Sequence, residues 1–480
     1  MAAAAAEMDE TEEEAKQAAA GQAAATTEAT VTEWRVTLGN DVRTAALNAL
    51  DDMDINGAYS GAAIERQRRR TTLDGKDTAF LHELVYGVLK RRISLDYMIF
   101  QYSKIKRSRI SVTILNILRM GAYQMVFLDK VPVSAACNEG VKLAAKFGNP
   151  GSKAFVNAIL RKIAADKRPW GPEWLAGQKP GTPEYLSILH SYPVWLCERW
   201  LPRYGIAFTE ELLTAGNRRP ELTIRANALR TTVAELRAGL EAEGFRVQPG
   251  HYVEAALLIE NPGDFSGSAL FAQGLFTVQD ESSMLAAAAL APAAGTRILD
   301  MCAAPGGKCG YLAELTRDDA YIEAWDLYPH KIKLVEQNNE RLGIKSVAAS
   351  LRDARVYEES LRDSFDAVLV DAPCTGLGII RKKPEIKWTK SQKDIGEVCA
   401  IQKRILDNAA AYLKKGGVLL YSVCTTEPEE GEQMIAAFLA SHREFSPEPI
   451  EGGLHELRLF PNSHDVDGFY MAKLRKTEAG

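Results

Sequence analysis

The sequence lacks the features that mark membrane, secreted and disulfide-stabilised proteins. None of its apolar stretches approaches the ~18–20 residues that an α-helix needs to cross a bilayer. The N-terminal stretch has no basic region followed by an apolar core, so we expect no signal peptide. The seven cysteines are scattered and form no CxxC pair, which favours neither a disulfide framework nor a zinc site. These absences predict a cytoplasmic protein with free thiols and no metal.

Bulk positive charge is also missing. The net formal charge is −5, but residues 1–33 hold eight acidic residues against one lysine, which leaves 57 basic and 55 acidic residues for the rest of the chain. Residues 1–36 have the Ala/Glu-rich composition of a disordered acidic tail. Any nucleic-acid site must therefore come from local clusters of Lys and Arg rather than from the overall charge.

Residues 37–168 carry the apolar spacing of helices. Segments such as DTAFLHELVYGVLKRRISLDYMIFQY and SVTILNILRMGAYQMVFL repeat apolar residues at i, i+3 and i+4, and GNPG at 148–151 interrupts the pattern. We therefore expect a helical bundle. Two basic clusters within it, at residues 66–70 and 90–109, are either solvated faces or a platform for a phosphate backbone.

A short Pro- and Gly-rich stretch follows the helical region. Residues 169–184 have the composition of a linker. Residues 185–270 then alternate between helix and strand patterns, which predicts a small α/β subdomain. Its short strand TIRAN carries Arg225 and Asn227, a polar pair that lies either in a surface turn or against RNA.

Residues 271–476 alternate strands with helices, a rhythm typical of a doubly wound parallel sheet. The strand-like segments are RILDMC, YIEAWDL, SVAASLRD, FDAVLVDAPC and GGVLLYSVC. In such sheets ligands bind at the carboxyl ends of the strands, near the point where the strand order reverses. The residues that end these segments are therefore the candidates for a functional site.

A nucleoside site is indicated at the first three strand ends. Gly306 and Gly307 lie in a turn of small residues, where backbone N–H groups can approach a ligand closely. Asp326 ends the next strand and can accept both hydroxyls of a ribose. Asp353 ends the strand after it and can accept from an adenine amino group. No GKS or GKT is present, so a nucleoside cofactor without a pyrophosphate fits, and S-adenosylmethionine is such a cofactor.

Two cysteines end the last two strands. Cys374 and Cys424 should both lie beside the cofactor loop. They are either inert core residues or two sulfurs that share one reaction. The inert interpretation is the one we give to the other cysteines outside the cofactor loop, Cys137, Cys197, Cys309 and Cys399.

The shared reaction would be methylation of a cytosine. Carbon 5 of cytosine is a poor nucleophile, but a thiolate that adds to carbon 6 makes it enamine-like and able to attack a methyl sulfonium. A base must then remove the carbon-5 proton before the thiol leaves. Asp371 and Lys308 are placed to hold the pyrimidine edge, and the target base must be extruded or lie in an open loop.

A basic run follows the first of these cysteines. From Arg381 to Lys393 the chain holds six basic residues and Trp388. Basic residues interleaved with an aromatic suit a single-stranded nucleic acid. The alternative is an exposed basic loop.

These motifs together resemble a known family. DMCAAPGGK, DAPCTGLG, RKKPEIKW and YSVCTTEPEE resemble motifs of the RNA cytosine-5 methyltransferases, and VQDESS and DGFYMAKL fit the same family. AFLHELVYGVLKRR and AFVNAILRKI resemble the NusB-type RNA-binding fold. Residues 38–476 as a whole resemble the bacterial 16S rRNA cytosine-5 methyltransferases of the RsmB/Sun type. The resemblance implies an all-α NusB-like helical bundle, a small RRM-like α/β subdomain and a Rossmann-like class I methyltransferase domain.

The resemblance also implies roles that the residues alone leave open. Cys424 would be the nucleophile and Cys374 would assist proton removal and enzyme release. The family usually has Thr before the nucleophile, where this chain has Val423. The cofactor would be S-adenosylmethionine, held by Cys302, Ala303, Ala304, Pro305, Gly306, Gly307, Lys308, Asp326, Asp353 and Asp371.

The implied partner is 16S rRNA, free or early in assembly, with methylation at cytosine 967 by a monomeric enzyme. Two alternatives stay open. The same chemistry could act on tRNA or another rRNA site, although tRNA enzymes of this family generally lack the NusB-like part. The chain could instead be a NusB-like RNA-binding protein with a vestigial catalytic domain, which the intact cysteine, lysine and aspartate motifs disfavour.

Overall fold

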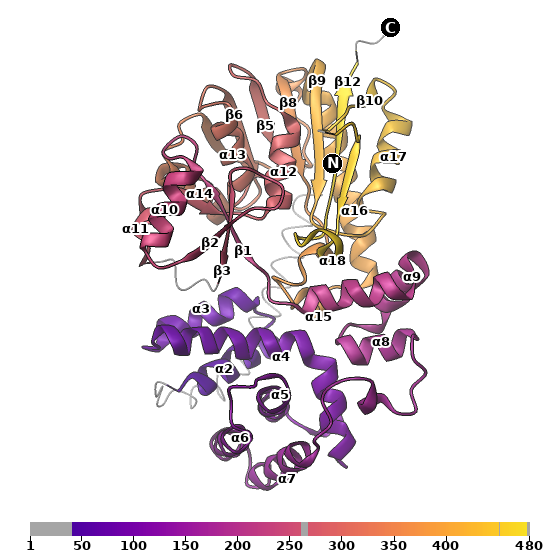
Figure 1. Ribbon diagram of the computed structural model, residues 1–480. Helices are drawn as coiled ribbons and strands as arrows, with labels where there is room; N and C mark the ends of the chain where they lie inside the picture. The colour runs from indigo at the N-terminus through magenta and orange to yellow at the C-terminus, as the bar shows by residue number, and fades with distance from the viewer. Residues whose placement is uncertain (1–40, 261–266, 451, 478–480) are drawn as a thin grey trace, which may run out of the picture.

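A computed structural model describes residues 41–260, 267–450 and 452–477 (Figure 1). The acidic tail predicted at residues 1–36 lies outside the described residues. The helical bundle forms the lower part of the molecule in Figure 1, and the α/β parts lie above it. Within the described residues, no helix is long and apolar enough to cross a membrane.

The predicted helical bundle is confirmed. Its first helix begins after Asp41, whose carboxylate caps the N–H groups of Arg43 and Thr44, and ends at Gly57, which adopts the left-handed φ of 70°. The predicted interruption at residues 148–151 separates its last two helices. The helices are α2 (Val42–Asn56), α3 (Ser60–Arg70), α4 (Gly75–Tyr102), α5 (Val112–Phe127), α6 (Val133–Phe147) and α7 (Ser152–Ala165).

The segment predicted as a linker is partly packed. It contains a short 3-10 helix, η3 (Pro172–Leu175), in which Trp174 and Leu175 are buried. Two helices follow, α8 (Pro183–His190) and α9 (Val194–Asn217), and α8 lies against α4, where Ser94 Oγ donates to the Ile188 carbonyl at 2.7 Å.

The small α/β subdomain has a four-stranded antiparallel sheet. Its strand order is β2-β3-β1-β4, with one helix between β1 and β2 and a second before β4, which is the βαββαβ arrangement of RRM-like folds. The elements are β1 (Leu222–Ala226), α10 (Val233–Ala242), β2 (Arg246–Pro249), β3 (Ala256–Glu260), α11 (Ala269–Ala272) and β4 (Phe276–Val278).

The C-terminal part is the predicted doubly wound sheet. Its order is β10-β12-β9-β8-β5-β6-β7, and the five strands from β9 to β7 run parallel. The order reverses at β5, between β6 and β8, as in Rossmann-like methyltransferases. The strands are β5 (Arg297–Asp300), β6 (Tyr321–Asp326), β7 (Val347–Leu351), β8 (Phe365–Asp371), β9 (Leu413–Val423), β10 (Phe445–Pro447), β11 (Glu456–Leu459) and β12 (Phe469–Lys476).

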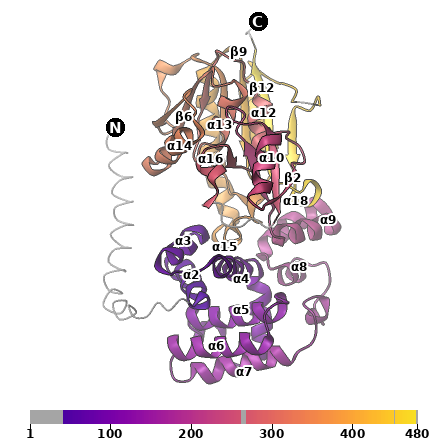
Figure 2. The same ribbon diagram turned by 60° about the vertical axis from the view of Figure 1, so that its left-hand side comes forward.

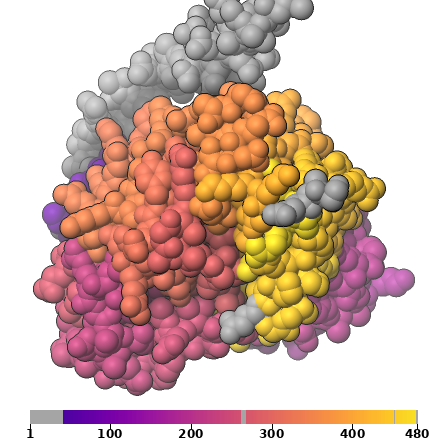
Figure 3. Space-filling model, turned by 90° about the horizontal axis from the view of Figure 1, so that it is seen from above, coloured from indigo at the N-terminus to yellow at the C-terminus, as the bar shows by residue number. Residues whose placement is uncertain are grey.

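Helices cover both faces of this sheet, as the turned view in Figure 2 shows. They are α12 (Glu281–Leu290), α13 (Gly307–Leu315), α14 (Pro329–Leu342), α16 (Gln392–Tyr412) and α17 (Glu432–Ser441). Two short helices, α15 (Ile386–Thr389) and α18 (Pro461–His464), lie at the lower end of the sheet in Figure 1. Seen from above, the surface is made mostly by the orange and yellow residues of this part (Figure 3).

The carboxyl ends of the parallel strands face the helical bundle. β12 runs upward to the C-terminus in Figure 1 and pairs antiparallel with β9, so β9 and its parallel neighbours end on the lower side. The short helix α15 lies between that edge of the sheet and α4 in both ribbon views (Figures 1 and 2).

Candidate active site

The predicted site residues meet at this lower edge of the sheet. Asp326 and Asp371 are the last residues of β6 and β8, and Cys424 directly follows β9. Asp300, which the sequence analysis did not single out, ends β5 at the same edge. Parallel strands end at a common edge, so residues far apart in the sequence come together there.

The two strand-end cysteines are in contact. The Sγ atoms of Cys374 and Cys424 lie 3.3 Å apart, although fifty positions separate them in the chain. The hydrogen bond with Cys424, together with burial, raises the pKa of the Cys374 thiol well above its ordinary value. Cys374 therefore keeps its proton, and either sulfur can be the donor in the S–H···S hydrogen bond.

A charged lysine stands beside the pair. Lys308 Nζ donates to Asp371 Oδ2 at 2.7 Å and to Ser283 Oγ at 3.3 Å. Burial alone would lower the pKa of Lys308, but Asp371 and then Asp300 raise it above its ordinary value. The second oxygen of Asp371 accepts from Ser422 Oγ at 2.8 Å, so the lysine and the carboxylate are held in one orientation.

The predicted cofactor loop forms a cradle at the start of α13. Gly306 is the N-cap, with φ of 101°, a left-handed conformation that favours glycine. A Cβ atom at Gly306 would lie 3.4 Å from Val335 Cα. The Pro305 carbonyl accepts from Asn338 Nδ2 at 2.8 Å, and Ala303 N donates to the Trp325 carbonyl at 2.8 Å, so the loop is anchored on both sides.

A buried carboxylate lies under this loop. Asp300 is fully buried, and its Oδ2 atom has no hydrogen-bond partner within the described part of the chain. Burial, and next the charge of Asp371, raises the pKa of Asp300 to about 7. An unpartnered carboxylate oxygen beside a glycine-containing loop fits a cofactor that carries positive charge, as S-adenosylmethionine does.

The two expected nucleoside contacts differ in availability. Asp326 is buried at its strand end and lies 3.4 Å from Lys331 Nζ. Asp353, by contrast, is engaged by Arg355, whose Nε and Nη2 lie 2.9 and 2.7 Å from its two oxygens. This pairing lowers the pKa of Asp353. An adenine amino group would have to share those oxygens with Arg355.

Sequence reasoning missed the residue that joins the two cysteine segments. Glu430 accepts from Thr375 N at 2.8 Å, from Thr375 Oγ1 at 2.5 Å and from Thr425 Oγ1 at 3.0 Å. Thr375 and Thr425 are the residues that directly follow Cys374 and Cys424. The EPEE motif held the signal for Glu430, but nothing in the sequence says which of its carboxylates turns inward.

Both interpretations of the TIRAN pair are wrong. Arg225 and Asn227 are fully buried, neither in a surface turn nor accessible to RNA. Arg225 pairs with Glu314 at 2.7 Å and donates to the Gly307 carbonyl at 2.8 Å, so the small subdomain supports the cofactor loop. Asn227 donates to two backbone carbonyls.

The basic run after Cys374 is divided: Arg381 and Lys387 are buried, whereas Lys383 and Lys393 are exposed. An RNA contact stays a prediction for the exposed lysines only. Arg381 and Lys382 are paired with Asp467, with Arg381 Nε and Lys382 Nζ at 2.9 and 2.7 Å from its oxygens. Lys382 also pairs with Asp280. Trp388 packs against the helical bundle and donates to the Leu89 carbonyl at 3.0 Å.

The basic cluster at residues 90–109 divides in two. Lys90 donates to the Arg218 carbonyl at 2.6 Å, and burial lowers its pKa to about 8, so its end of the cluster is no solvated face. The other end, Lys104, Lys106, Arg107 and Arg109, is exposed. The second cluster, at residues 66–70, is mostly exposed and includes ion pairs to Asp52 and Glu65.

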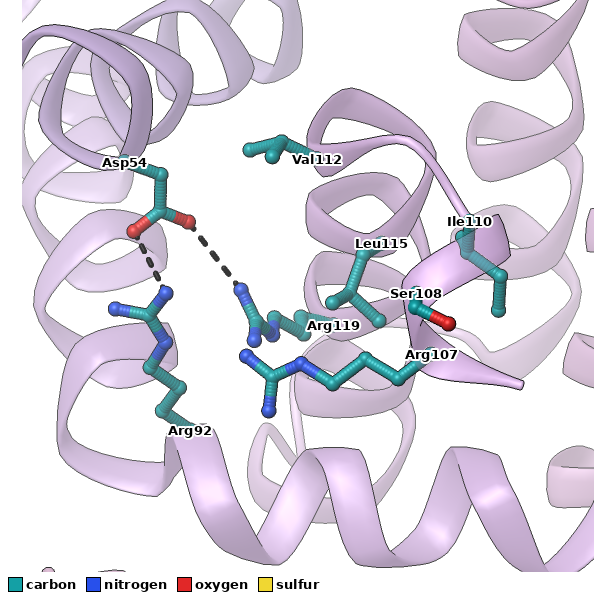
Figure 4. A pocket seen from close by; sticks show the side chains of 8 residues that line it. All are labelled: Asp54, Arg92, Arg107, Ser108, Ile110, Val112, Leu115 and Arg119. Carbon is teal, nitrogen blue, oxygen red and sulfur yellow. Dashed lines mark hydrogen bonds and ion pairs between the residues drawn. The ribbon is translucent and has the colours of Figure 1, made fainter.

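A pocket of about 600 Å³ lies beside the exposed end of this cluster. Arg92, Arg107 and Arg119 point toward its centre, and Asp54 bridges Arg92 at 2.8 Å and Arg119 at 3.3 Å (Figure 4). Phosphate binding stays a prediction for the surface around the pocket and for the exposed cluster at residues 66–70.

Val423, the cysteines expected to be inert and the expected absence of a metal site complete the residues and features singled out in the sequence. Val423, at the position of the family's usual Thr, is fully buried in the apolar core of the sheet. Burial raises the pKa of Cys197 to about 12 and that of Cys399 to about 11. Among the described residues, no three His, Cys, Asp or Glu side chains are grouped to hold a metal ion.

Profiles of known families match three parts of the chain. The profile of "16S rRNA methyltransferase RsmB/F" matches residues 287–475, that of the NusB family residues 40–165, and that of a ferredoxin-like domain of RsmF/B-like methyltransferases residues 192–266. The "Probable ribosomal RNA small subunit methyltransferase B" of Bacillus subtilis is 36% identical over 447 residues, which cover 91% of this chain and 98% of the relative. The chain belongs to the RsmB/F family. It is accordingly an S-adenosylmethionine-dependent rRNA methyltransferase.

Solved structures of similar proteins support the same assignment. The crystal structure of PH0851 aligns with a TM-score of 0.78 and 28% identity over 92% of this chain and all of that one. A methyltransferase homolog from Pyrococcus horikoshii aligns with a TM-score of 0.56 and 29% identity over 62% of this chain. The similarity to PH0851 therefore extends over 92% of this chain.

Proposed function

We propose that this protein methylates carbon 5 of a cytosine in 16S rRNA, at position 967, through a covalent bond between Cys424 and carbon 6 of the base. It acts in the cytoplasm as a monomer, on rRNA that is free or early in assembly. The observation that carries the proposal is the contact of the two sulfurs at 3.3 Å beside the Lys308–Asp371 pair. A vestigial catalytic domain would have no reason to keep the two cysteines, the lysine and the aspartate in this arrangement.

The first step belongs to Cys424. By the family resemblance Cys424 is the nucleophile: its thiol releases a proton to solvent, and the sulfur then supplies the electron pair that bonds to carbon 6 of the cytosine. Lys308 and Asp371 can hold the ring edge, because a charged amine donates to a carbonyl or ring nitrogen and a carboxylate accepts from the exocyclic amine. S-adenosylmethionine, when bound, supplies the methyl group to carbon 5.

The second step belongs to Cys374. Carbon 5 must lose its proton, and the bond between carbon 6 and sulfur must break, to restore the aromatic base. Cys374 carries a proton next to the leaving sulfur and can donate it to Cys424, while the carbon-5 proton replaces it. The proton that Cys424 released during addition is the one proton that the overall reaction liberates as the methyl sulfonium becomes a neutral thioether, so both cysteines end as thiols, as they began.

The cofactor would be held by residues 302–308 with Asp326, and Asp300 faces it from below. Asp353 would contact the cofactor only if the cofactor shared the Asp353 oxygens with Arg355. The tight anchoring of the loop by Asn338 and Arg225 supports a preorganised cofactor site.

The test is methylation of 16S rRNA that lacks this modification, with S-adenosylmethionine labelled in its methyl group. Mapping 5-methylcytidine in the product should give one cytosine, at position 967. Transfer RNA, 23S rRNA and other 16S segments serve as competing substrates. Label in tRNA or at another rRNA position would replace the proposed substrate, and no label in any RNA would favour the vestigial alternative.

A further inference from the structure

A buried lysine joins the catalytic part to the helical bundle. Lys387, in α15, is 1% exposed. Its Nζ donates to the Lys90 carbonyl at 2.9 Å, to the Ser191 carbonyl at 2.8 Å and to Asn217 Oδ1 at 3.1 Å. The same nitrogen lies 4.2 Å from the centre of the Tyr192 ring. Three N–H donors meet three oxygen acceptors, and within the described residues none of these is a carboxylate.

The acceptors come from separate elements. Lys90 belongs to α4 of the bundle, Ser191 lies between α8 and α9, and Asn217 ends α9. An isolated buried charge is costly, and burial lowers the pKa of Lys387 well below its ordinary value. Apolar packing alone would be served by a leucine or methionine. A lysine at this position lets one atom, its Nζ, hold α4, the connection between α8 and α9, and the end of α9 together.

Neighbouring residues repeat the connection. Glu385 Oε1 accepts from Ser60 Oγ at 2.7 Å, in α3 of the bundle. Trp388 donates to the Leu89 carbonyl, and the guanidinium of Arg92 lies 5.7 Å from its ring centre. Arg92 also lines the basic pocket of Figure 4. Residues 385–388 therefore lie next to the basic pocket, whose surface we expect to bind RNA phosphates.

The other end of the segment is fixed to the cysteine pair. Gly378 N donates to the Cys424 carbonyl at 3.1 Å, and Gly468 N donates to the Gly378 carbonyl at 2.9 Å. Residues 374–389, which we name the junction segment, are thus held at the catalytic sulfurs and at the bundle. Little freedom remains between the two attachments.

We propose that Lys387 is a positioning residue: it holds the helical bundle at a fixed place relative to Cys374 and Cys424, so that RNA bound on the bundle presents its target base to the cysteine pair. This inference rests on the proposed function. Lys387 touches neither the base nor the cofactor site, and acts through the junction segment. RNA that reaches only the catalytic part does not depend on it.

The test compares Lys387→Met with wild type on two substrates, unmodified 16S rRNA and a short stem-loop that contains only the target cytosine. The stem-loop is assayed in single turnover with excess enzyme. Lys403→Met, an exposed lysine on α16, is the matched control. Misplacement of a bound substrate by about 1 Å costs of order 100-fold in rate, so we expect kcat on 16S rRNA to fall at least ~10-fold in Lys387→Met. KM should change little, and the stem-loop rate should stay within about twofold of wild type.

Hydrogen exchange gives a second readout. Residues 385–389 and the part of α4 around Lys90 should exchange faster in Lys387→Met than in Lys403→Met, while S-adenosylmethionine affinity stays unchanged. Equal losses on both RNAs would make Lys387 a support of the catalytic fold and overturn the proposal. Unchanged kcat on 16S rRNA, or unchanged exchange at the junction, would overturn it as well. If wild type methylates neither RNA, the proposed function itself fails.

Discussion

At the scale of single residues, the site depends on which sulfur holds the proton. The contact with Cys424 and burial raise the pKa of Cys374, so this thiol keeps its proton beside Cys424. The residues alone could name both cysteines but could not rank them, and the ranking comes from the family resemblance. What the structure adds is the 3.3 Å contact between the two sulfurs, which is not visible in a linear motif.

Asp300 should make cofactor binding depend on pH. Its pKa of about 7 means that it is neutral in the fold below that pH and ionised above it. A cationic ligand gains from the ionised form, so the affinity for S-adenosylmethionine should rise as the pH rises from 6 to 8, by at most about tenfold per unit. Titration calorimetry across this range measures the effect.

Asp300→Asn is the control for this dependence. The amide has no proton to lose, so affinity should be lower at pH 8 and nearly flat between pH 6 and 8. If Asp300→Asn folds, as judged by its melting temperature, and keeps the wild-type pH dependence, another group is responsible.

At the scale of elements, strands and helices were predictable and their surroundings were not. The five parallel strands were found from short apolar runs, because strands buried on both faces read as continuous apolar segments. The ion pairs of Arg381 and Lys382 in the basic run at 381–393 were not predicted, because charge in a sequence implies solvent only when no partner is near. Asp280 and Asp467, about 100 residues before and 85 after it, are those partners.

The same limit applies to the small subdomain and to Glu430. Arg225 is buried only because Glu314, from a helix of the next domain, lies opposite it. Glu430 acts on residues next to Cys374, across 55 positions of sequence. Contacts of this separation arise from the sheet topology, so local patterns carry no record of them.

The junction segment should be intolerant of a single added methyl group. A Cβ atom at Gly378 would lie 1.9 Å from the Gly468 carbonyl oxygen, closer than any real contact. We expect Gly378→Ala to destabilise the protein by about 1–3 kcal/mol and to lower methylation more than cofactor binding. Chemical denaturation measures the first effect.

Gly396→Ala is the matched control, because a Cβ atom there meets nothing within 4 Å. It should leave both stability and methylation close to wild type. Equal stability of the two variants would mean that the close approach of the two glycine backbones is not a constraint.

At the scale of the whole molecule, one apolar core is shared by three parts of the chain. Met98 of the bundle, Trp200 of α9 and Ile386 of the junction segment belong to the same buried cluster. Such a shared core couples the unfolding of the parts that build it. The intact protein should therefore unfold in one calorimetric transition.

A chain that begins at Thr182 would lack the helical bundle. It would therefore lose Met98 from the shared core, and the side chain of Trp388 would become exposed. It should melt at a lower temperature than the intact protein and lose more activity on 16S rRNA than RNA affinity alone explains. Two separate transitions in the intact protein, or a truncated chain as stable as the whole, would show that the parts are independent.

The central claim is that Cys424 attacks the base and Cys374 releases it. The most direct measurement is a denaturing gel of Cys424→Ala and Cys374→Ala after incubation with S-adenosylmethionine and 16S rRNA that lacks the modification. We predict a slowly migrating protein–RNA adduct with Cys374→Ala, because elimination stalls, and none with Cys424→Ala. An adduct with Cys424→Ala and none with Cys374→Ala would contradict the assignment and make Cys374 the nucleophile.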